Sequence, residues 1–481
     1  MNLAILVLYA VFLIFTMGRI LLDTRSTSKT LAYLLIVILF PVFGIIFYLA
    51  FGINYRRQHN ISALWKAQQR LDTDYLAKVS DSTDDLLNQH RTQLGQYGEL
   101  VHFLRQLGQE FLSQNHFTLL VNGEQKFPEV LAALMEARHF IHMEYYDWEN
   151  DVRGNQIKDI LLKKAEDGVQ VRVLYDDYAS RKIKGNIVRE LKAGGVSIFP
   201  KIKVKVNHLA SRMNHRDHRK VIIVDGHIGF LGGINISDRY DNTIDTGLWW
   251  RDTHMKVTGP LVLNLQRHFI VSWNSSQSQP LPYSNDLFPE VQSPVTPGIA
   301  ALAQVIAGGP VYAMSNIMLT YFKIFTLANE KLYITNPYFI PNESILDALK
   351  QAALSGVDVR IMVPEKSDSM IVGLSGNSYF EELLEAGVRI FLYQKGFVHA
   401  KTVVADERLS VVGTANMDIR SFELNFEIMS VIYSGEFASN LERIFLEDLQ
   451  ECREIDQEQW RSRGLGQKLL ESSARLMSAF L

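Results

Sequence analysis

The chain has 481 residues and a formal net charge of −3 at pH 7, and its isoelectric point is about 6.5. Proteins that bind duplex nucleic acid usually carry a basic patch and a high isoelectric point, so we expect no nucleic-acid partner. Hydrophobic residues make up 47% of the chain, which is sufficient for a buried core. The single cysteine, Cys452, cannot form an internal disulfide, so the fold does not depend on an oxidising compartment.

Two apolar segments open the chain within residues 1–55. Residues 3–22 are uncharged except for Arg19, whose long side chain can reach the membrane interface. Residues 30–55 are uncharged throughout and contain a proline and a glycine, which membrane helices tolerate when neighbours satisfy the freed backbone groups. A helix needs about 20 apolar residues to cross a bilayer, so we predict two transmembrane helices here.

A cleaved signal peptide is the alternative for the first segment. The segment lacks a basic amino-terminal region and an Ala-x-Ala-like site, and a second apolar segment follows at once. Two crossings place the amino terminus and the main part of the chain on the same side of the membrane. Basic residues lie both between the two segments and after the second one, so the positive-inside rule does not decide the orientation. The residues compared are Arg19, Arg25 and Lys29 against Arg56, Arg57, Lys66 and Arg70. We expect the main part on the cytoplasmic side.

The rest of the chain divides into a connector, two halves and a tail. Residues 56–115 are polar and predict a helical connector. Residues 116–285 and 300–450 are predicted as two α/β domains, with a linker rich in Ser, Pro and Gln at residues 275–299. Residues 451–481 predict a helical tail, which is either an amphipathic helix on the bilayer or packed on the preceding domain.

The two halves repeat the same order of expected elements. Strands are predicted at residues 140–146, 169–175, 332–335 and 357–363, and helices at residues 156–166 and 345–354. The sequence Gly-Val-x-Val-Arg occurs in both halves, beginning at Gly168 and Gly356. Strands that alternate with helices indicate parallel pairing, with helices covering the sheet. The predicted fold is α/β, with two like domains packed pseudo-symmetrically around one active site and preceded by the two transmembrane helices.

Each half carries one copy of a polar motif, His-x-Lys-x4-Asp-x6-Gly-(small)-x-Asn. The first copy contains His218, Lys220, Asp225, Gly233 and Asn235, and the second contains His399, Lys401, Asp406, Thr414 and Asn416. A single His-x-Lys pair would be ordinary surface decoration, but two copies with identical spacing inside a wider repeat indicate catalysis. We expect one shared site at the interface between the halves, and two independent sites are the alternative.

The spacing within each motif separates its residues into two groups. Side chains alternate along a strand, so His218 and Lys220 share one face, as do His399 and Lys401. The motif aspartates have the opposite parity, and Asp225 begins a strong hairpin-turn signal. We therefore expect Asp225 and its counterpart in the second motif to support the catalytic set structurally.

The remaining groups suit a phosphodiester. Neutral imidazole is a competent nucleophile, and protonated imidazole can protonate a leaving alcohol. Two ammonium groups offset the phosphate charge. Asn235 and Asn416 can donate hydrogen bonds to its oxygens, and Gly233 and Thr414 are expected beside the phosphate, where glycine permits close approach. A carboxylate must hold the other nitrogen of a nucleophilic histidine, and we expect Asp252 and Glu427, which follow the two motifs, to orient the histidines.

Several other chemistries have no matching motif. The sequence contains no Cys/His cluster with zinc spacing, no Gly-x4-Gly-Lys-Ser/Thr loop and no Gly-x-Ser-x-Gly elbow. We therefore predict chemistry without a metal ion or cofactor.

The motif pair resembles that of the phospholipase D superfamily, and almost the whole chain resembles the bacterial cardiolipin synthases. The stretches that carry this resemblance are residues 41–44, 141–146, 215–220, 229–235, 250–254, 335–341 and 413–421. Thr414 stands where many members have Ser, and its hydroxyl keeps the hydrogen-bonding capacity. Asp217 stands where Asn often precedes the first motif histidine, which puts the local headgroup contacts in doubt.

The resemblance implies a multi-pass enzyme of the bacterial cytoplasmic membrane. Its substrates would be two phosphatidylglycerol molecules, its products cardiolipin and glycerol, and its intermediate a phosphohistidine. It implies that His218 is the nucleophile and His399 the acid and base, although the pseudo-symmetry allows the reverse. A hydrolytic phospholipase D and transfer to another alcohol share the same motifs and remain the alternatives.

Overall fold

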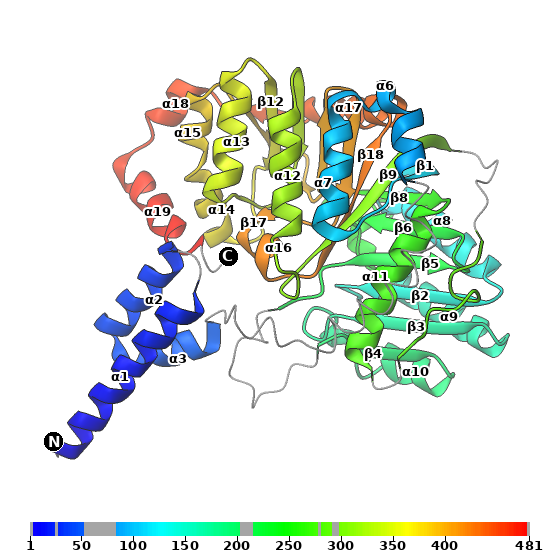
Figure 1. Cartoon of the computed structure of the whole chain (residues 1–481), viewed down its shortest axis with the longest axis horizontal. Helices are drawn as coiled ribbons and strands as arrows, with labels where there is room; N and C mark the ends of the chain where they lie inside the picture. Colours follow the sequence, from blue (N-terminus) through cyan, green and yellow to red (C-terminus); the bar gives the residue numbers. More distant parts are fainter. Residues whose placement is uncertain are drawn as a thin grey trace.

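The computed structural model describes residues 3–24, 27–51, 83–202, 215–277, 280–290 and 298–478 (Figure 1). Much of the predicted connector and part of the predicted linker lie outside these residues, as do residues 479–481. Five of the basic residues compared for membrane orientation also lie outside them, namely Arg25, Arg56, Arg57, Lys66 and Arg70. The predicted orientation therefore stays a prediction.

One sheet of fifteen strands runs through the described part of the chain. In spatial order, its first half contains β4 (Ser197–Pro200), β3 (Gln170–Tyr175), β2 (Phe140–Tyr145), β5 (Lys220–Val224), β6 (Ile228–Gly232), β8 (Thr253–Thr258) and β1 (Ser113–Val121). The second half continues with β9 (Ile299–Gly308), β18 (Glu427–Tyr433), β16 (Leu409–Gly413), β15 (Thr402–Ala405), β10 (Lys331–Thr335), β12 (Asp358–Pro364), β13 (Arg389–Tyr393) and β19 (Cys452–Glu454). The two halves meet where β1 and β9 pair antiparallel, with Ser113 opposite Ala303.

Apart from β19 at the edge, the two halves have the same strand order and the same strand directions. In the first half β2, β3 and β4 run parallel while β5, β6 and β8 are antiparallel neighbours. In the second half β10, β12 and β13 run parallel while β15, β16 and β18 are antiparallel neighbours. The predicted α/β fold of two like halves is confirmed.

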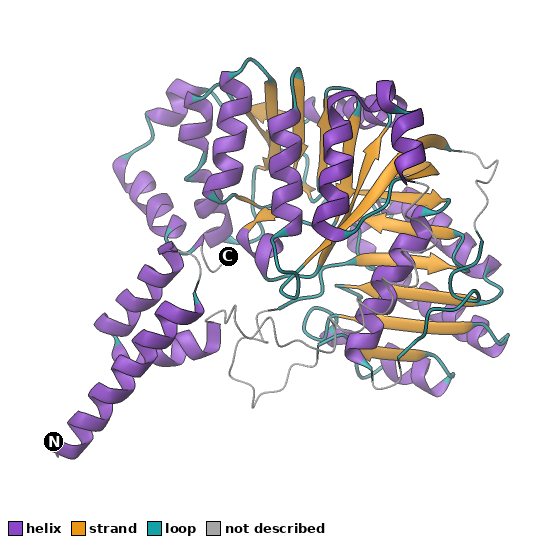
Figure 2. Cartoon of the chain, in the orientation of Figure 1, coloured by secondary structure: helices purple, strands orange, loops and turns teal. Residues whose placement is uncertain are grey.

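Helices cover both faces of each half (Figure 2). The first half has α8 (Asn122–Glu136), α9 (Val152–Glu166) and α10 (Ile187–Ala193) on one face and α11 (Leu261–Ser276) on the other. The second half has α12 (Asn316–Leu327), α13 (Glu343–Leu354) and α15 (Phe380–Glu385) on one face and α17 (Gly435–Leu449) on the other. Strands buried on both faces require apolar residues at successive positions, as in the Val-Ile-Ile-Val run of β5.

The end of the predicted connector belongs to the core of the second half. Its helix α7 (Gly98–Gly108) follows the short α6 (Arg91–Leu94) and buries Leu100, Val101 and Leu104. These side chains pack in the same cluster as Ile306 of β9 and Tyr321 of α12. A segment predicted as a polar spacer therefore also supplies one helix of the catalytic fold.

The amino-terminal segment forms three helices, where the sequence predicted two. They are α1 (Leu3–Asp23), α2 (Thr27–Leu39) and α3 (Pro41–Phe51). The second apolar segment is divided at Phe40, because Pro41 has no backbone N–H with which to continue the helix. A Cβ on Gly44 would lie 2.6 Å from the carbonyl oxygen of Ile36, so glycine lets α3 fold closely against α2. Among the residues described, no helix is both long and apolar enough to span a membrane.

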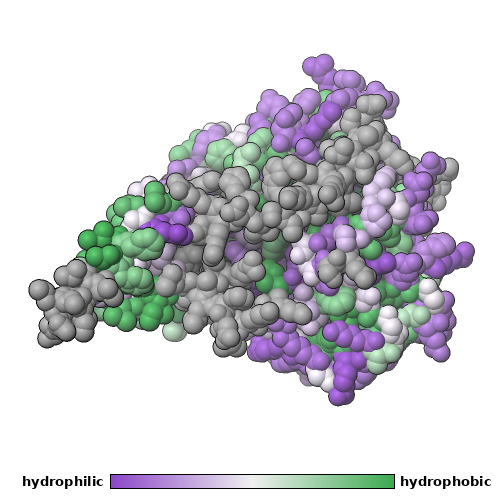
Figure 3. Space-filling model, turned by 60° about the horizontal axis from the view of Figure 1, so that its bottom comes forward, coloured by the Kyte–Doolittle hydropathy of each residue, from purple (hydrophilic) through white to green (hydrophobic). Residues whose placement is uncertain are grey.

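The three helices expose an apolar surface, which Figure 3 shows in green at one end of the molecule. Its exposed large side chains are Val11, Phe12, Ile14, Phe15, Leu21, Leu22, Leu31, Leu35, Ile38, Leu39, Phe40, Val42, Phe43 and Ile46. An ion pair of 2.6 Å joins Lys29 of α2 to Glu423 at the end of α16 (Ile419–Glu423) in the second half. The apolar helices are thereby tied to the catalytic fold.

The carboxyl-terminal tail folds onto the second half and keeps its apolar side outside. It contains α18 (Gln457–Arg461) and α19 (Leu465–Arg475), and α19 packs on α14 (Met370–Asn377). Polar side chains make the attachment, since Lys468 and Arg475 pair with Glu381 and Glu382. The exposed apolar side chains of the tail are Leu465, Leu469, Leu470, Leu476 and Met477. The amphipathic helix thus docks on the preceding domain through its polar side, and its placement on a bilayer stays a prediction.

The two motif aspartates fix the connections at the far ends of the motif strands. Asp225 has φ +51° and Gly226 has φ +71°, the backbone of a type I′ hairpin turn. The Asp225 carboxylate accepts hydrogen bonds from the backbone N–H groups of Arg138, His139 and Phe140 at 2.7–2.8 Å. The carboxylate therefore joins the β5–β6 turn to the start of β2.

Asp406 repeats this arrangement in the second half. Its carboxylate accepts from the backbone N–H groups of Asn329, Glu330 and Lys331 at 2.8–3.2 Å, and from the hydroxyl of Tyr97 at 2.8 Å. Both motif aspartates thus bind backbone N–H groups at the turn ends of the motif strands, and the structural role expected from their parity stays a prediction.

We expect Asp225→Ala and Asp406→Ala each to lower the free energy of unfolding by about 3 kcal/mol, because several backbone donors lose a charged acceptor. Urea denaturation measures this loss. Asp245→Ala is the matched control, since the exposed Asp245 accepts only from the backbone N–H of Gly247 among the contacts described. Equal stability of all three variants would contradict the structural role.

Candidate active site

Both motif histidines line one cavity between the two halves. His218 lies two residues before the buried strand β5, and His399 lies three residues before β15. A cavity of about 730 Å³ is lined by both histidines and by Asn235 and Asn416. Another cavity of about 780 Å³ borders Arg251 and contains neither motif histidine. The geometry brings the two motifs to one place.

Each motif histidine contacts a carboxylate from the opposite half. Nδ1 of His218 lies 2.9 and 3.0 Å from the two carboxylate oxygens of Glu427. Nδ1 of His399 lies 2.7 Å from Oδ2 of Asp252. A carboxylate at Nδ1 holds the proton there and leaves Nε2 with its lone pair. Both predicted carboxylates thus lie at histidines, in a crossed pairing that the sequence did not reveal.

Short backbone pairings between the halves enforce the crossing. The strand β14 (Phe397–Val398) pairs in parallel with β7 (Trp250–Arg251), and the N–H of His399 donates to the carbonyl of Arg251 at 2.7 Å. On the other side, the N–H of His218 donates to the carbonyl of Phe426 at 3.0 Å. Each histidine segment therefore runs alongside the residues just before the carboxylate that it uses.

Two fully buried lysines stand beside the histidines. Nζ of Lys220 donates to the carbonyl of His218 at 2.7 Å, and Nζ of Lys401 donates to the carbonyl of His399. Burial lowers the pKa of Lys220 to about 8, against the opposing charges of Glu427 and Asp252. Burial, together with the charge of Lys220, lowers the pKa of Lys401 to about 7. The site therefore holds desolvated cations that an entering anion would stabilise.

The two histidines are neutral at neutral pH in the free protein. Burial lowers the pKa of His399 to about 3, and the charge of Lys401 lowers it further while Asp252 opposes the shift. Burial also lowers the pKa of His218, against the carboxylate of Glu427. Burial raises the pKa of Glu427, but His218 and Lys220 lower it overall, so this carboxylate is ionised. Neutral imidazoles with a free Nε2 are competent nucleophiles.

The two motif asparagines differ in their hydrogen bonds. Asn235 donates to the hydroxyl of Tyr240 at 2.6 Å and accepts from the backbone N–H of Asp147 at 3.3 Å. Oδ1 of Asn416 is buried and has no hydrogen-bond partner among the described residues. Both amides border the cavity, where an amide NH2 group can donate to an oxygen of a bound ligand.

Gly233 and Thr414 serve the carboxylates, which corrects the expectation that they lie beside phosphate. A Cβ on Gly233 would lie 2.1 Å from Oδ1 of Asp252, so glycine leaves room for that carboxylate. The hydroxyl of Thr414 is fully buried and donates to Glu427 at 2.6 Å. Neither residue lines the cavity, because these pseudo-equivalent positions support the groups that orient the histidines.

Aromatic side chains form walls that the motif search missed. The ring of Tyr146 lies edge-on to His218 at 4.7 Å between centroids. The rings of Trp250 and Tyr240 lie edge-on to His399 at 5.5 and 5.7 Å. Tyr146 and Trp250 lie in stretches that carried the family resemblance, residues 141–146 and 250–254, but the sequence assigned them no role. These rings pack against the two imidazoles and line this part of the cavity.

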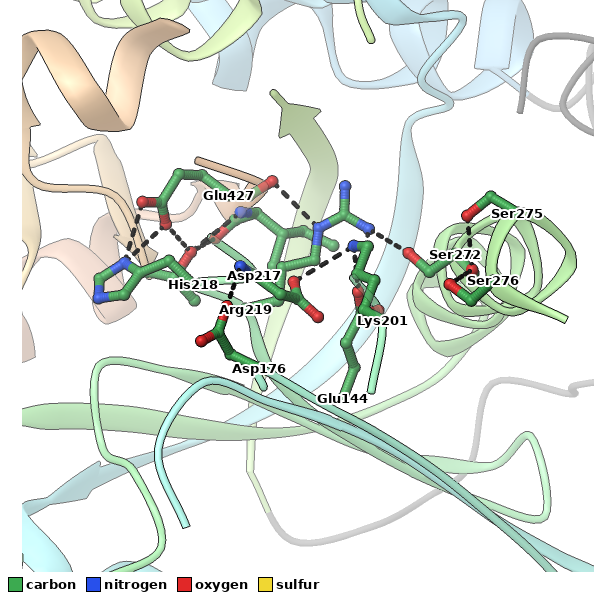
Figure 4. A network of polar contacts seen from close by, with 12 residues as sticks. Glu144, Asp176, Lys201, Asp217, His218, Arg219, Ser272, Ser275, Ser276 and Glu427 are labelled. Atoms are coloured by element: carbon green, nitrogen blue, oxygen red, sulfur yellow. Dashed lines mark hydrogen bonds and ion pairs between the residues drawn. The ribbon is translucent and has the colours of Figure 1, made fainter. Parts of the chain in front are cut away.

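A buried ionic network lies behind His218 (Figure 4). Nζ of Lys201 lies 2.6 Å from Glu144 and 3.2 Å from Asp217, and Arg219 lies 3.7 Å from Glu144. Burial, with the nearby charge of Glu144, raises the pKa of Asp217 well above its ordinary value. Asp217 does not line the cavity. Asp217, which stands where the family often has Asn, therefore contacts the buried ionic network and does not reach the cavity.

The crossed pairing predicts which histidine responds to each carboxylate. In Asp252→Asn, the Nδ1–H signal of His399 should shift upfield because its charged acceptor is lost, and the signal of His218 should stay in place. Glu427→Gln should produce the reverse pattern. Proton NMR of protein labelled with ¹⁵N-histidine measures both signals. If each substitution instead moves the signal of the histidine in its own half, the carboxylates pair within each half and the crossed pairing is wrong.

Comparison with known proteins identifies the family. The description "Cardiolipin synthase, PLD-like domain" matches residues 130–273 and 321–449, and "Phospholipase_D-nuclease N-terminal" matches residues 5–52. A cardiolipin synthase of Geobacillus kaustophilus is 39% identical over 479 residues, covering 99% of this chain and 93% of that relative. A cardiolipin synthase of Listeria monocytogenes is 36% identical over 489 residues, covering 100% of this chain and 98% of that relative.

A solved structure shares the fold. The phosphatidylserine synthase of Haemophilus influenzae superposes with a TM-score of 0.59 at 16% identity, over 79% of this chain and 100% of that chain. At this identity the likeness concerns the fold alone, and the family assignment depends on the relatives that match over the full length. The chain belongs to the cardiolipin synthase family of the phospholipase D superfamily.

Proposed function

We propose that this protein is a cardiolipin synthase that transfers a phosphatidyl group between two phosphatidylglycerol molecules and releases glycerol. The observation that carries the proposal is the shared cavity, in which each motif histidine is oriented by a carboxylate of the other half. The relatives named cardiolipin synthase match the chain from end to end, which supports the choice of substrate. Exchange of one phosphodiester for another needs no nucleotide, metal ion or other cofactor to supply free energy.

In the first step, His218 is the proposed nucleophile. Its Nε2 attacks phosphorus of the donor lipid, and the bond from phosphorus to the glycerol oxygen breaks. His399, protonated once the phosphate anion is bound, gives its proton to the departing glycerol. Lys220 and Lys401 offset the charge on the phosphoryl oxygens in a site with little water. A phosphatidyl group on His218 and neutral His399 remain.

In the second step, the acceptor lipid takes the place of glycerol. Neutral His399 removes the proton from a glycerol hydroxyl of the second phosphatidylglycerol, and that oxygen attacks phosphorus. The bond from phosphorus to His218 breaks and cardiolipin leaves. Water must not replace the acceptor, so the intermediate requires the sheltered cavity and its aromatic walls.

We propose that the protein is anchored in the bacterial cytoplasmic membrane with its cavity close to the lipid surface. The exposed apolar helices α1 to α3 exceed what a water-facing surface normally displays. Met370 and Ile371 of α14 are exposed beside Asp368 and Ser369, which line the cavity. The apolar side of α19 continues this surface, since α19 packs on α14. A transmembrane course of the amino-terminal helices and a cytoplasmic catalytic part belong to this proposal.

The test of function uses purified full-length protein and phosphatidylglycerol vesicles, with cardiolipin, phosphatidic acid and glycerol quantified. We expect cardiolipin and glycerol in equal amounts with little phosphatidic acid, because the acceptor is a second lipid. His218→Asn and His399→Asn should each abolish turnover, since the two roles are complementary. Phosphatidic acid in place of cardiolipin would show that water is the acceptor, and the alternative of a hydrolytic phospholipase D would then hold.

The buried lysines predict the alkaline limb of the pH profile. A lysine is cationic below its pKa, so kcat/KM should fall as pH rises through about 7 to 8, where Lys401 and Lys220 lose their protons. Bound phosphate favours the cationic form, so the fall in kcat should occur at higher pH. Initial rates of cardiolipin formation between pH 5 and about 10, at several substrate concentrations, measure the alkaline fall of kcat/KM and that of kcat.

Lys401→Arg is the matched variant for this limb, because a guanidinium stays protonated throughout the range. In the activity that this variant retains, the fall of kcat/KM near pH 7 should be absent, because Lys401 has been replaced. The fall near pH 8, where Lys220 loses its proton, should remain. An alkaline limb unchanged in this variant would assign the titration to another group.

A further inference from the structure

The first half buries a histidine whose ring has no hydrogen-bond partner. His254 lies on β8 and is fully buried, and neither of its ring nitrogens has a partner among the residues described. A buried polar group without a partner costs free energy, so its presence calls for a physical reason. His254 does not line the cavity, and neither copy of the catalytic motif includes it.

The strand register places His254 next to a catalytic lysine. Gly232 of β6 pairs with His254 of β8. On the other side of β6, the register with β5 brings Lys220 opposite Gly232. Residues that pair across neighbouring strands project from the same face of the sheet. Glycine has no side chain, so no side chain of β6 stands between the imidazole and Lys220. A Cβ on Gly232 would lie 2.6 Å from Nδ1 of His254.

The second half has the same register but a different side chain. Lys401 lies opposite Gly413 in the register of β15 with β16, and the N–H of Gly413 donates to the carbonyl of Lys401 at 3.3 Å. Gly413 pairs in turn with Met429 of β18, which is fully buried. A thioether is at most a weak acceptor. An imidazole therefore neighbours Lys220, where a thioether neighbours Lys401.

His254 faces helix α8 and is neutral. Lys256 shares its face of β8 and pairs with Glu129 of α8 at 2.9 Å. Burial lowers the pKa of His254 well below its ordinary value, and the charges of Lys126 of α8 and of Lys220 lower it further. A neutral imidazole has one N–H group and one nitrogen that accepts a hydrogen bond.

A third polar group without a partner lies on the other side of Lys220. Tyr145 of β2 pairs with Lys220, and its buried hydroxyl has no hydrogen-bond partner within the described part of the chain. Nζ of Lys126 lies 5.0 Å from the centre of the Tyr145 ring. A buried water needs about two to four polar partners. The ammonium of Lys220, the imidazole of His254 and the phenol of Tyr145 supply them.

Groups from several elements act on Lys220. They are the carboxylates of Glu427, Asp252, Asp217 and Asp147, the ammonium groups of Lys126 and Lys401, and the rings of His218 and Tyr146. Burial lowers the pKa of Lys220 to about 8 and the pKa of Lys401 to about 7. The lysine beside the imidazole thus keeps its proton to higher pH than the lysine beside the thioether.

We propose that His254 is a positioning residue that keeps Lys220 cationic, because its imidazole accepts from a buried water that in turn accepts from the Lys220 ammonium. Met429 gives Lys401 no such support. Lys220 is therefore charged before the substrate phosphate enters, and phosphate binding completes the protonation of Lys401. The inference rests on the proposed function for the use of this charge, but the protonation state of Lys220 is measured without lipid.

NMR of purified full-length protein labelled with ¹³Cε-lysine tests the proposal, because the Cε shift follows protonation of the amine. Lys220→Arg identifies the Lys220 signal by its loss. Wild-type Lys220 should titrate near pH 8. In His254→Met the midpoint should fall by about one pH unit, which is about a tenfold loss of proton affinity. His254→Gln keeps a polar side chain that can bond the water, so it should restore most of the wild-type midpoint.

His142→Met is the matched control. His142 of β2 is also fully buried, but its Nδ1 lies 2.9 Å from Gln266 of α11, on the opposite face of the sheet. The loss of this imidazole should leave the midpoint of Lys220 in place.

Three results would overturn the role of His254. An unchanged midpoint in His254→Met would show that the imidazole does not act on Lys220. An equal fall in His254→Gln would assign the effect to packing, and an equal fall in His142→Met would assign it to a general loosening of the fold. If the midpoints move as expected but the wild-type protein makes no cardiolipin from phosphatidylglycerol, the proposed function is wrong and the role of His254 stands.

Discussion

The contact between each motif histidine and a carboxylate of the opposite half determines how the active site is assembled. His218 uses Glu427 and His399 uses Asp252, so neither half holds a complete catalytic pair. Burial makes the arrangement demanding, because an ionised carboxylate without its partner would be destabilising in the interior. The short parallel pairing of β7 with β14 and the bridge from Asp217 to Phe426 therefore serve catalysis as well as folding.

The same burial explains the electrostatics. Lys220 and Lys401 are buried, and burial lowers the pKa of both because it disfavours their charged forms. In the proposed mechanism, a phosphodiester anion offsets this cost when it binds, and the two lysines stabilise the charge that develops during transfer. The same proposal requires a sheltered site, because water must not reach the phosphohistidine.

Periodicity and the repeat were enough to predict the α/β class and the duplication, and the motif pair named the histidines and asparagines that line the shared cavity. The His-x-Lys spacing places two side chains on one face of a strand, and the Asp-Gly pair at Asp225 predicts the turn that the structure contains. These features are local, and local sequence encodes them directly.

Features that depend on packing between distant segments could not be predicted. The crossing of Asp252 and Glu427 is set by interdomain pairing, and two carboxylates at similar spacing are compatible with either arrangement. Gly233 was expected beside phosphate, but its small size accommodates Asp252, a contact that no sequence pattern announces. The division of the second apolar segment at Phe40 is a different case, because Pro41 is a local signal and the prediction of one continuous membrane helix set it aside.

The most direct test of a single shared site with complementary histidines uses a lipid whose leaving group needs no proton, phosphatidyl-p-nitrophenol. In His399→Asn the account predicts a burst of nitrophenolate equal to the enzyme present, with the phosphatidyl group retained on His218, because only the acid and base is missing. In His218→Asn it predicts no burst. A burst in His218→Asn, or none in His399→Asn while the wild-type protein turns the same lipid over, would contradict the assignment of the two roles.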